Sequence, residues 1–168
     1  MKKYLILVLI VLLIGALTAV ALADKHGQAG KSDIAHLYLY EKDASWVIVE
    51  DGAWGKMKYN LSGETFDFVF NGHGLVEGTE YTLIYYPDPW PGEGLICLGS
   101  GTVNEEGDIH IAESVDTGDL PIEGDENDGA KIWLVLSDDF DCSGGWSAWN
   151  PTEYLFEYDL ITFEYTGE

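Results

Sequence analysis

The side chains that could support catalysis are present in this 168-residue chain, but they form no recognisable catalytic pattern. The histidines stand on separate segments, without the spacing typical of a zinc site: His26, His36, His73 and His110. The sequence has no Gly-x-Ser-x-Gly turn for a nucleophilic serine. With 30 aspartates and glutamates, some pair always lies at the separation that glycosidases use, so carboxylate pairs carry little information. We therefore expect a protein that is not an enzyme.

Three tryptophans in loops are the main candidates for binding chemistry. Trp90 lies between prolines in the segment 86–92, which cannot be a central strand because three prolines remove backbone donors. Trp146 and Trp149 flank small residues in a second loop. Sugar rings have apolar faces that stack on indoles, so these residues could bind an extracellular glycan or a protein surface. The alternative is that the three rings fold back as lids over the open ends of the core.

The two cysteines are expected to form a disulfide. Cys97 lies on an expected strand and Cys142 in the second tryptophan loop, and a pair in an exported chain most simply bridges. A bridge that closes a loop of this size is worth roughly 4 kcal/mol in the chain-entropy model. It would place both tryptophan loops on one side of the domain, within roughly 20 Å. Neither cysteine is followed closely by His and Met, which excludes a cupredoxin-type copper site.

Two acidic loops could bind calcium. The segment 125–129 carries three carboxylates and an asparagine, and the second loop offers Asp138, Asp139 and Asp141. Neither loop matches the twelve-residue EF-hand pattern, and solvated turns are the alternative. Calcium is the one cofactor that the sequence suggests, and Asp138, Asp139 and Asp141 are its candidate ligands.

The charge of the chain limits its partners. There are 8 lysines and no arginine, and the formal net charge is −22. Because no basic surface is available to neutralise phosphates, nucleic acids are excluded as partners, and anionic membrane surfaces are disfavoured for the same reason. The acidity indicates attraction of cations or a surface that stays solvated.

The N-terminus predicts export. Residues 1–23 combine a basic start, an apolar run and the small-residue cleavage pattern Ala21-Leu22-Ala23, as a signal peptide does. The run is long enough to cross a bilayer, so an uncleaved anchor is the alternative. Residues 24–32 are expected to be a flexible spacer and 33–168 a single domain. The expected location is extracellular or on the cell surface, where the sequon at Asn60 could be glycosylated.

Short alternating segments predict an all-β domain. Phe66, Phe68 and Phe70 alternate with more polar residues, the period of a strand with one buried face. The apolar run 131–136 predicts a central strand. Other strands are expected at 34–40, 46–49, 53–61, 82–86, 94–103, 109–111 and 154–165, and Trp46 and Trp133 are expected in the core. The predicted fold is a single antiparallel Greek-key β-sandwich of about seven to nine strands, with a jelly roll or a barrel as the alternative.

One segment resembles a known motif. Leu75 to Tyr81 is similar to the tyrosine corner of immunoglobulin-like and fibronectin type III sandwiches, although Glu77 stands where those families often carry proline. The resemblance covers about seven residues; it implies an immunoglobulin-like architecture in the broad sense and nothing about function. An ordinary hairpin turn is the alternative. The mature region as a whole also looks like small secreted prokaryotic proteins, which implies no activity.

These observations favour a secreted or cell-surface binding or adhesion module without catalytic activity, with the loop tryptophans as a possible glycan site. A structural subunit of a surface layer or filament is the first alternative, and it requires self-association through an open sheet edge. A hydrolase that acts on polysaccharide is the second alternative, and it requires a cleft with perturbed carboxylates.

Overall fold

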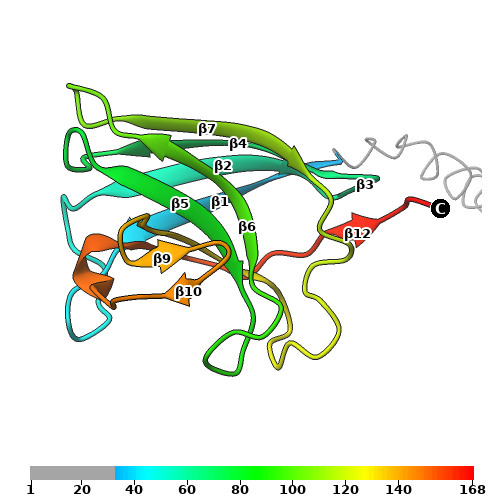
Figure 1. Cartoon of the computed structure of the whole chain (residues 1–168). Coiled ribbons are helices and arrows are strands. Elements are labelled where there is room, and N and C mark those ends of the chain that lie inside the picture. The colour runs from blue at the N-terminus through cyan, green and yellow to red at the C-terminus, as the bar shows by residue number, and fades with distance from the viewer. Residues whose placement is uncertain (1–32) are drawn as a thin grey trace, which may run out of the picture. The chain divides into compact units, whose positions relative to one another are not determined.

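The computed structural model describes residues 33–168, and the predicted signal peptide and spacer lie outside them. Figure 1 shows one large antiparallel sheet with short elements beside it. Its strands, in sheet order, are β6 (Ile96–Thr102), β5 (Glu80–Tyr86), β8 (Lys131–Leu136), β11 (Leu155–Glu157), β1 (Ile34–Glu41), β2 (Trp54–Asn60), β4 (Phe66–His73) and β7 (Ile109–Val115). The all-β prediction is confirmed.

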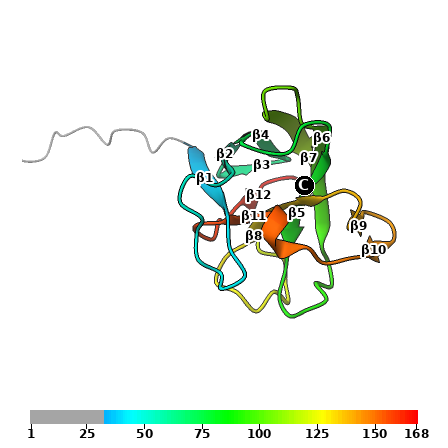
Figure 2. The ribbon, with the colours of Figure 1, turned by 90° about the vertical axis from the view of Figure 1, so that its left-hand side faces the viewer.

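The sheet curls until it is nearly a barrel, as the end-on view in Figure 2 shows. Its edge strands, β6 and β7, approach each other but form no ladder in the described chain. A Cβ atom on Gly99 would come within 2.9 Å of Ile111 Cγ2, and one on Gly101 within 3.2 Å of Ile109 Cγ1. The two glycines therefore let β7 side chains pack closely over β6, and side-chain packing closes the barrel at this seam.

Period-two alternation fills the interior of the barrel. Leu37 and Leu39 on β1, and the three phenylalanines of β4, point inward and are almost fully buried. Aromatic neighbours pack there at ring-centroid distances of 5.3–5.7 Å, as between Phe66 and Tyr59, Phe68 or Phe163. The phenylalanine pattern thus identified the core correctly.

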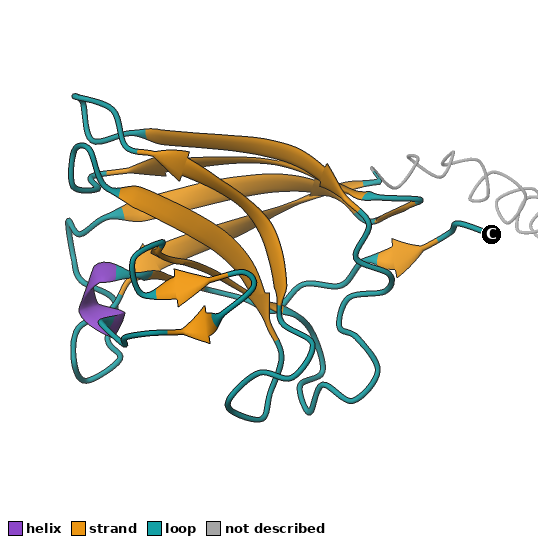
Figure 3. Ribbon diagram, viewed as in Figure 1, coloured by secondary structure: helices purple, strands orange, loops and turns teal. Residues whose placement is uncertain are grey.

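A second apolar cluster lies on the opposite, outer face of the sheet. It joins Ile84 and Tyr86 of β5, Trp133 and Val135 of β8, and Phe156 of β11. A hairpin of β9 (Phe140–Asp141) and β10 (Gly145–Trp146) and the short 3-10 turn η1 (Pro151–Glu153) cover this cluster. Figure 3 shows both elements outside the large sheet. Because β8 is buried on both faces, its sequence is apolar from Ile132 to Leu136.

Two local predictions differ from the structure. Residues 46–49 form a loop with one isolated bridge, Lys42 to Ile48, and no strand. The segment 154–165 divides into β11 and β12 (Glu164–Tyr165), and β12 pairs in parallel with β3 (Ser62–Gly63).

Within residues 33–168, no helix is long and apolar enough to cross a membrane.

Candidate functional site: a tryptophan cluster on the outer face

The structure brings the three predicted loop tryptophans together. The Trp90 ring centroid lies 5.9 Å from that of Trp146 and 5.9 Å from that of Trp149, and the last two are 5.2 Å apart. Trp90 comes from the loop between β5 and β6, whereas Trp146 lies on β10 and Trp149 in the segment after it, more than 50 residues later in the chain. One aromatic cluster is therefore built from a loop and a distant hairpin segment, and the sequence had predicted only that the two lie on one side. The loop prediction for Trp146 is wrong, because Trp146 pairs with Phe140 in the β9–β10 hairpin.

The three rings differ in how they are held. Trp90 is 60% exposed and Trp149 40% exposed, whereas Trp146 is half-buried against the ring of Phe140 at 5.0 Å. The Nε1 atom of Trp146 is buried and has no hydrogen-bond partner among the described residues. Trp146 therefore acts in part as a lid over the outer apolar cluster, and Trp90 is the ring most available to a ligand.

A shallow groove of about 540 Å³ runs beside this cluster. Trp90, Leu95 and Trp146 give it apolar walls, and Asp141 and Ser143 add polar groups. Flat rings with a few hydrogen-bonding groups are the combination that sugars require, because a sugar has both apolar ring faces and hydroxyls.

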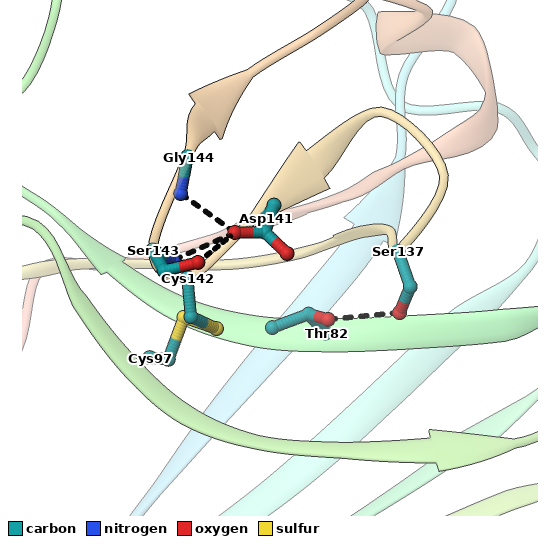
Figure 4. Close-up of a disulfide and its surroundings, with 7 residues drawn as sticks. All are labelled: Thr82, Cys97, Ser137, Asp141, Cys142, Ser143 and Gly144. Atoms are coloured by element: carbon teal, nitrogen blue, oxygen red, sulfur yellow. Dashed lines mark hydrogen bonds between the residues drawn. A yellow bond between two sulfur atoms is a disulfide. The ribbon is translucent and has the colours of Figure 1, made fainter.

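The disulfide that the sequence predicted is present. Cys97 on β6 and Cys142 in the β9–β10 hairpin are bridged, with Cα atoms 5.9 Å apart. Figure 4 shows the bridge tying the hairpin to the sheet, beside the hydrogen bond between Thr82 and Ser137. The bridge therefore fixes one wall of the groove against the strand that follows the Trp90 loop.

The three aspartates predicted to bind calcium have separate structural roles. Asp139 is buried, and it accepts hydrogen bonds from Tyr154 Oη at 2.5 Å and from Asn150 Nδ2 at 2.9 Å. Asp141 Oδ1 accepts from Ser143 and Gly144, and these bonds lower the pKa of its carboxyl (Figure 4). Asp138 is exposed. No group of three or more potential metal ligands converges within residues 33–168, and calcium binding stays a prediction.

The other acidic segment folds around Asp125. Its carboxylate accepts hydrogen bonds from Tyr85 Oη, from both nitrogens of Asn127 and from the backbone of Asp88. Burial alone would raise the pKa of Asp125, but these bonds lower it overall. Asp88 also pairs with Lys131 of β8. Asp88, in the Trp90 loop, is thus held both by the Asp125 segment and by the first residue of β8.

Asn60, the predicted glycosylation site, holds a turn. Its Nδ2 donates to the carbonyl oxygens of Ser62 and Thr65, and its Oδ1 accepts from the backbone of Asp67. A glycan on Nδ2 would have to replace one of these donors. Glycosylation of Asn60 remains a prediction, and it would require this turn to lose one of its hydrogen bonds.

Sequence reasoning missed a second group of outward aromatic residues. Trp46 was expected in the core, but it is 54% exposed, adopts a φ of 63° in a loop and packs its ring against Phe156. Tyr38, Tyr40 and Trp54 lie on the outer face of β1 and β2. The sequence could have indicated the two tyrosines, because Tyr38 and Tyr40 alternate with the buried Leu37 and Leu39 and so point to the outer face.

One partly buried carboxyl was also missed. Glu157, at the end of β11, is partly buried, and its Oε2 has no hydrogen-bond partner among the described residues. Burial raises its pKa to about 7, although its own backbone, Lys42, Trp133 and Lys131 oppose the rise. No sequence pattern distinguishes this glutamate from the other acids.

Comparisons with known proteins found no matching family model, no similar curated protein and no similar solved structure.

Proposed function

We propose that the chain is a secreted or cell-surface binding module without catalytic activity that binds a glycan at the Trp90, Trp146 and Trp149 cluster. The observation that carries the proposal is the exposed Trp90 ring beside two further indoles and an open groove with polar groups. Stacking on these rings supplies affinity, and Asp141 and Ser143 supply hydrogen-bonding groups for hydroxyls.

The construction of the site supports a pre-formed platform. The disulfide fixes the hairpin, and the Asp125 network fixes the other loop. A ligand that meets rigid side chains loses less free energy to ordering them, so a shallow groove can still bind. The disulfide is also compatible with an oxidising, extracellular location.

The test is a glycan array followed by affinity electrophoresis in gels that contain each positive polysaccharide. Trp90→Ala should weaken binding by about tenfold or more, because it removes the most exposed ring. Val76→Ala is the matched control, since Val76 is 65% exposed at the turn between β4 and β5, outside the groove. Binding by Trp90→Ala that equals that of the parent would contradict this site.

A structural subunit that self-assembles is the second candidate. The observation that favours it is the pair of edge strands, β6 and β7, each of which has one ladder neighbour in the described sheet. A strand from another copy could pair with β6 or β7 only if the packing between these two strands opened at the seam. Size-exclusion chromatography and electron microscopy of the purified chain test this candidate, because it requires concentration-dependent assemblies.

A further inference from the structure

The outer face carries a row of large side chains well beyond the tryptophan cluster. The strand register pairs Trp54 with Tyr40, Tyr40 with Phe156, and Phe156 with Trp133. Each residue comes from the next strand, in the order β2, β1, β11 and β8, and their chain neighbours Leu39, Leu155 and Leu134 point into the interior. Directly paired side chains on one face of a sheet are neighbours, so this row is continuous.

Exposed rings lie in this row or beside it along its length. They are Trp54, Tyr38, Tyr158, Trp46, Trp149 and Trp90. Trp54 stacks with Tyr38 at 6.5 Å, and Tyr38 with Tyr40 at 6.3 Å; Tyr158 meets Tyr40 edge-on at 6.0 Å. We call these six exposed residues the aromatic track.

Buried rings connect the two ends of the track. Trp46 covers Phe156 at 5.0 Å, Phe156 touches Trp133 at 5.2 Å, and Trp133 lies 6.0 Å from Trp149. From β2 to β5 the sheet advances by four strand spacings, which is about 19 Å. Because the sheet is nearly a barrel, a ligand that follows the track must be elongated, lie across the strands and bend around the curved outer face.

The far end of the track has a groove of its own, with a volume of about 650 Å³. Tyr38, Tyr40 and Trp54 line it together with the carboxylates of Glu50 and Asp51. Lys56 lies over the Tyr38 ring, with Nζ 5.4 Å from the ring centroid. Rings, hydrogen-bond acceptors and an ammonium donor thus meet in the far groove. At the other end, Lys131 lies over the Tyr86 ring near Trp90, and its ammonium also pairs with Asp88.

Charge narrows the class of ligand. The net charge of −22 repels polyanions, and the carboxylates in the far groove would oppose an acidic sugar directly. Neutral sugar hydroxyls can both donate to carboxylates and accept from lysines. A neutral, extended polysaccharide fits the rings, the charges and the length of the track together.

We propose that the Tyr38, Tyr40 and Trp54 groove is a second glycan subsite, and that one neutral polysaccharide chain spans it and the Trp90 cluster across the strands. This inference rests on the proposed function. Two linked subsites give a polymer an affinity gain that a short oligosaccharide bound at one end does not have.

The test compares polymers with short oligosaccharides. Hydroxyethylcellulose, galactomannan and dextran are the neutral probes, polygalacturonate is the acidic probe, and the trisaccharides of the neutral polymers are the short ligands. Trp54→Ala should weaken polymer binding by about tenfold or more and leave trisaccharide binding at the Trp90 cluster unchanged. Tyr158→Ala, at a 64% exposed residue, is the second variant in case Trp54→Ala folds poorly.

Val69→Ala is the matched control, because Val69 is as exposed as Trp54 but lies on β4, outside the track. If Trp54→Ala and Tyr158→Ala bind polymer as the parent does while Trp90→Ala fails, the second subsite is wrong and the first stands. If the parent binds neither polymers nor trisaccharides, both proposals are wrong. Stronger binding of polygalacturonate than of every neutral polymer, or a dimer that Trp54→Ala abolishes in a parent that binds no polymer, also overturns the inference.

Discussion

The rings of Tyr86 and Trp133 stack with centroids 4.1 Å apart and planes 10° apart. The two residues lie on adjacent strands, β5 and β8, and both are buried on the outer face of the sheet. This stack is the floor beneath Trp90 and Trp149, whose rings lie 6.3 Å from Tyr86 and 6.0 Å from Trp133, respectively. The proposed binding surface is therefore the upper layer of a second core, and some of its residues stabilise the fold as well.

Alanine variants at Trp90 and Trp146 should differ in their effect on the stability of the fold. Trp146→Ala should lower the free energy of unfolding by about 2–3 kcal/mol, because it uncovers Phe140 and Tyr154. Trp90→Ala should change it by less than about 1 kcal/mol, because most of its ring is already exposed. Urea unfolding followed by circular dichroism measures both. Equal losses in the two variants would mean that Trp90 is a lid and not a platform.

Loss of the disulfide should weaken the domain and release the hairpin. The bridge spans 45 residues, so Cys97→Ser with Cys142→Ser should lower the free energy of unfolding by about 4 kcal/mol. The parent in reducing buffer is the control and should show a similar loss. Mass spectrometry of the unreduced chain should find both thiols oxidised. Two free thiols, or a denaturation midpoint that reductant does not move, would count against the bridge.

Substitution of Asp139 should lower the stability of the domain far more than substitution of its neighbour Asp138. Asp139→Ala leaves the buried hydroxyl of Tyr154 without its acceptor and frees Asn150, which should cost about 1–3 kcal/mol. Asp138→Ala is the control, because Asp138 is exposed and engages Ser147 only through its backbone oxygen. Thermal unfolding compares the two variants, and equal midpoints would show that the Asp139 hydrogen bonds add no stability.

Glu157 should make stability depend on pH. Its folded pKa of about 7 lies above the ordinary value of 4.5, so the folded state binds a proton more tightly than the unfolded state does. Stability from this group is therefore full below about pH 4.5, falls as pH rises to about 7, and then stays level, a change of up to about 3 kcal/mol.

Glu157→Gln should remove that part of the slope and raise stability at neutral pH. The other carboxylates give a background slope, so the difference between variant and parent is the quantity to measure. Glu153→Gln, at an exposed residue, is the control. If parent and Glu157→Gln have parallel stability curves between pH 4.5 and 7.5, the carboxyl is not perturbed.

The sequence predicted most of the fold because alternation reports burial directly. Phe66, Phe68 and Phe70 identified the core face of β4, and the run 131–136 identified a strand buried on both sides. How far the sheet curls depends on how β6 packs against β7, where side chains of Ile109 and Ile111 lie close to Gly99 and Gly101. Such long-range packing leaves no periodic signal.

The candidate site was predicted in part. Prolines around Trp90 and small residues around Trp146 marked loops, and the cysteine pair related them. The sequence could not show that Trp46 is exposed, because residues 46–49 resemble a strand but form a loop, in which Trp46 has a positive φ. The track was missed because it depends on the register across β2, β1, β11 and β8.

The most direct test is a titration of the ¹⁵N-labelled chain with the neutral polymers, following the indole Nε1–H resonance of each of the six tryptophans. Single Trp→Phe variants assign the resonances. The signals of Trp90, Trp149, Trp46 and Trp54 should shift in a saturable manner, while that of the buried Trp133 should move least. If no neutral polymer shifts Trp90 at concentrations up to the solubility limit, the protein does not bind neutral glycans through this face.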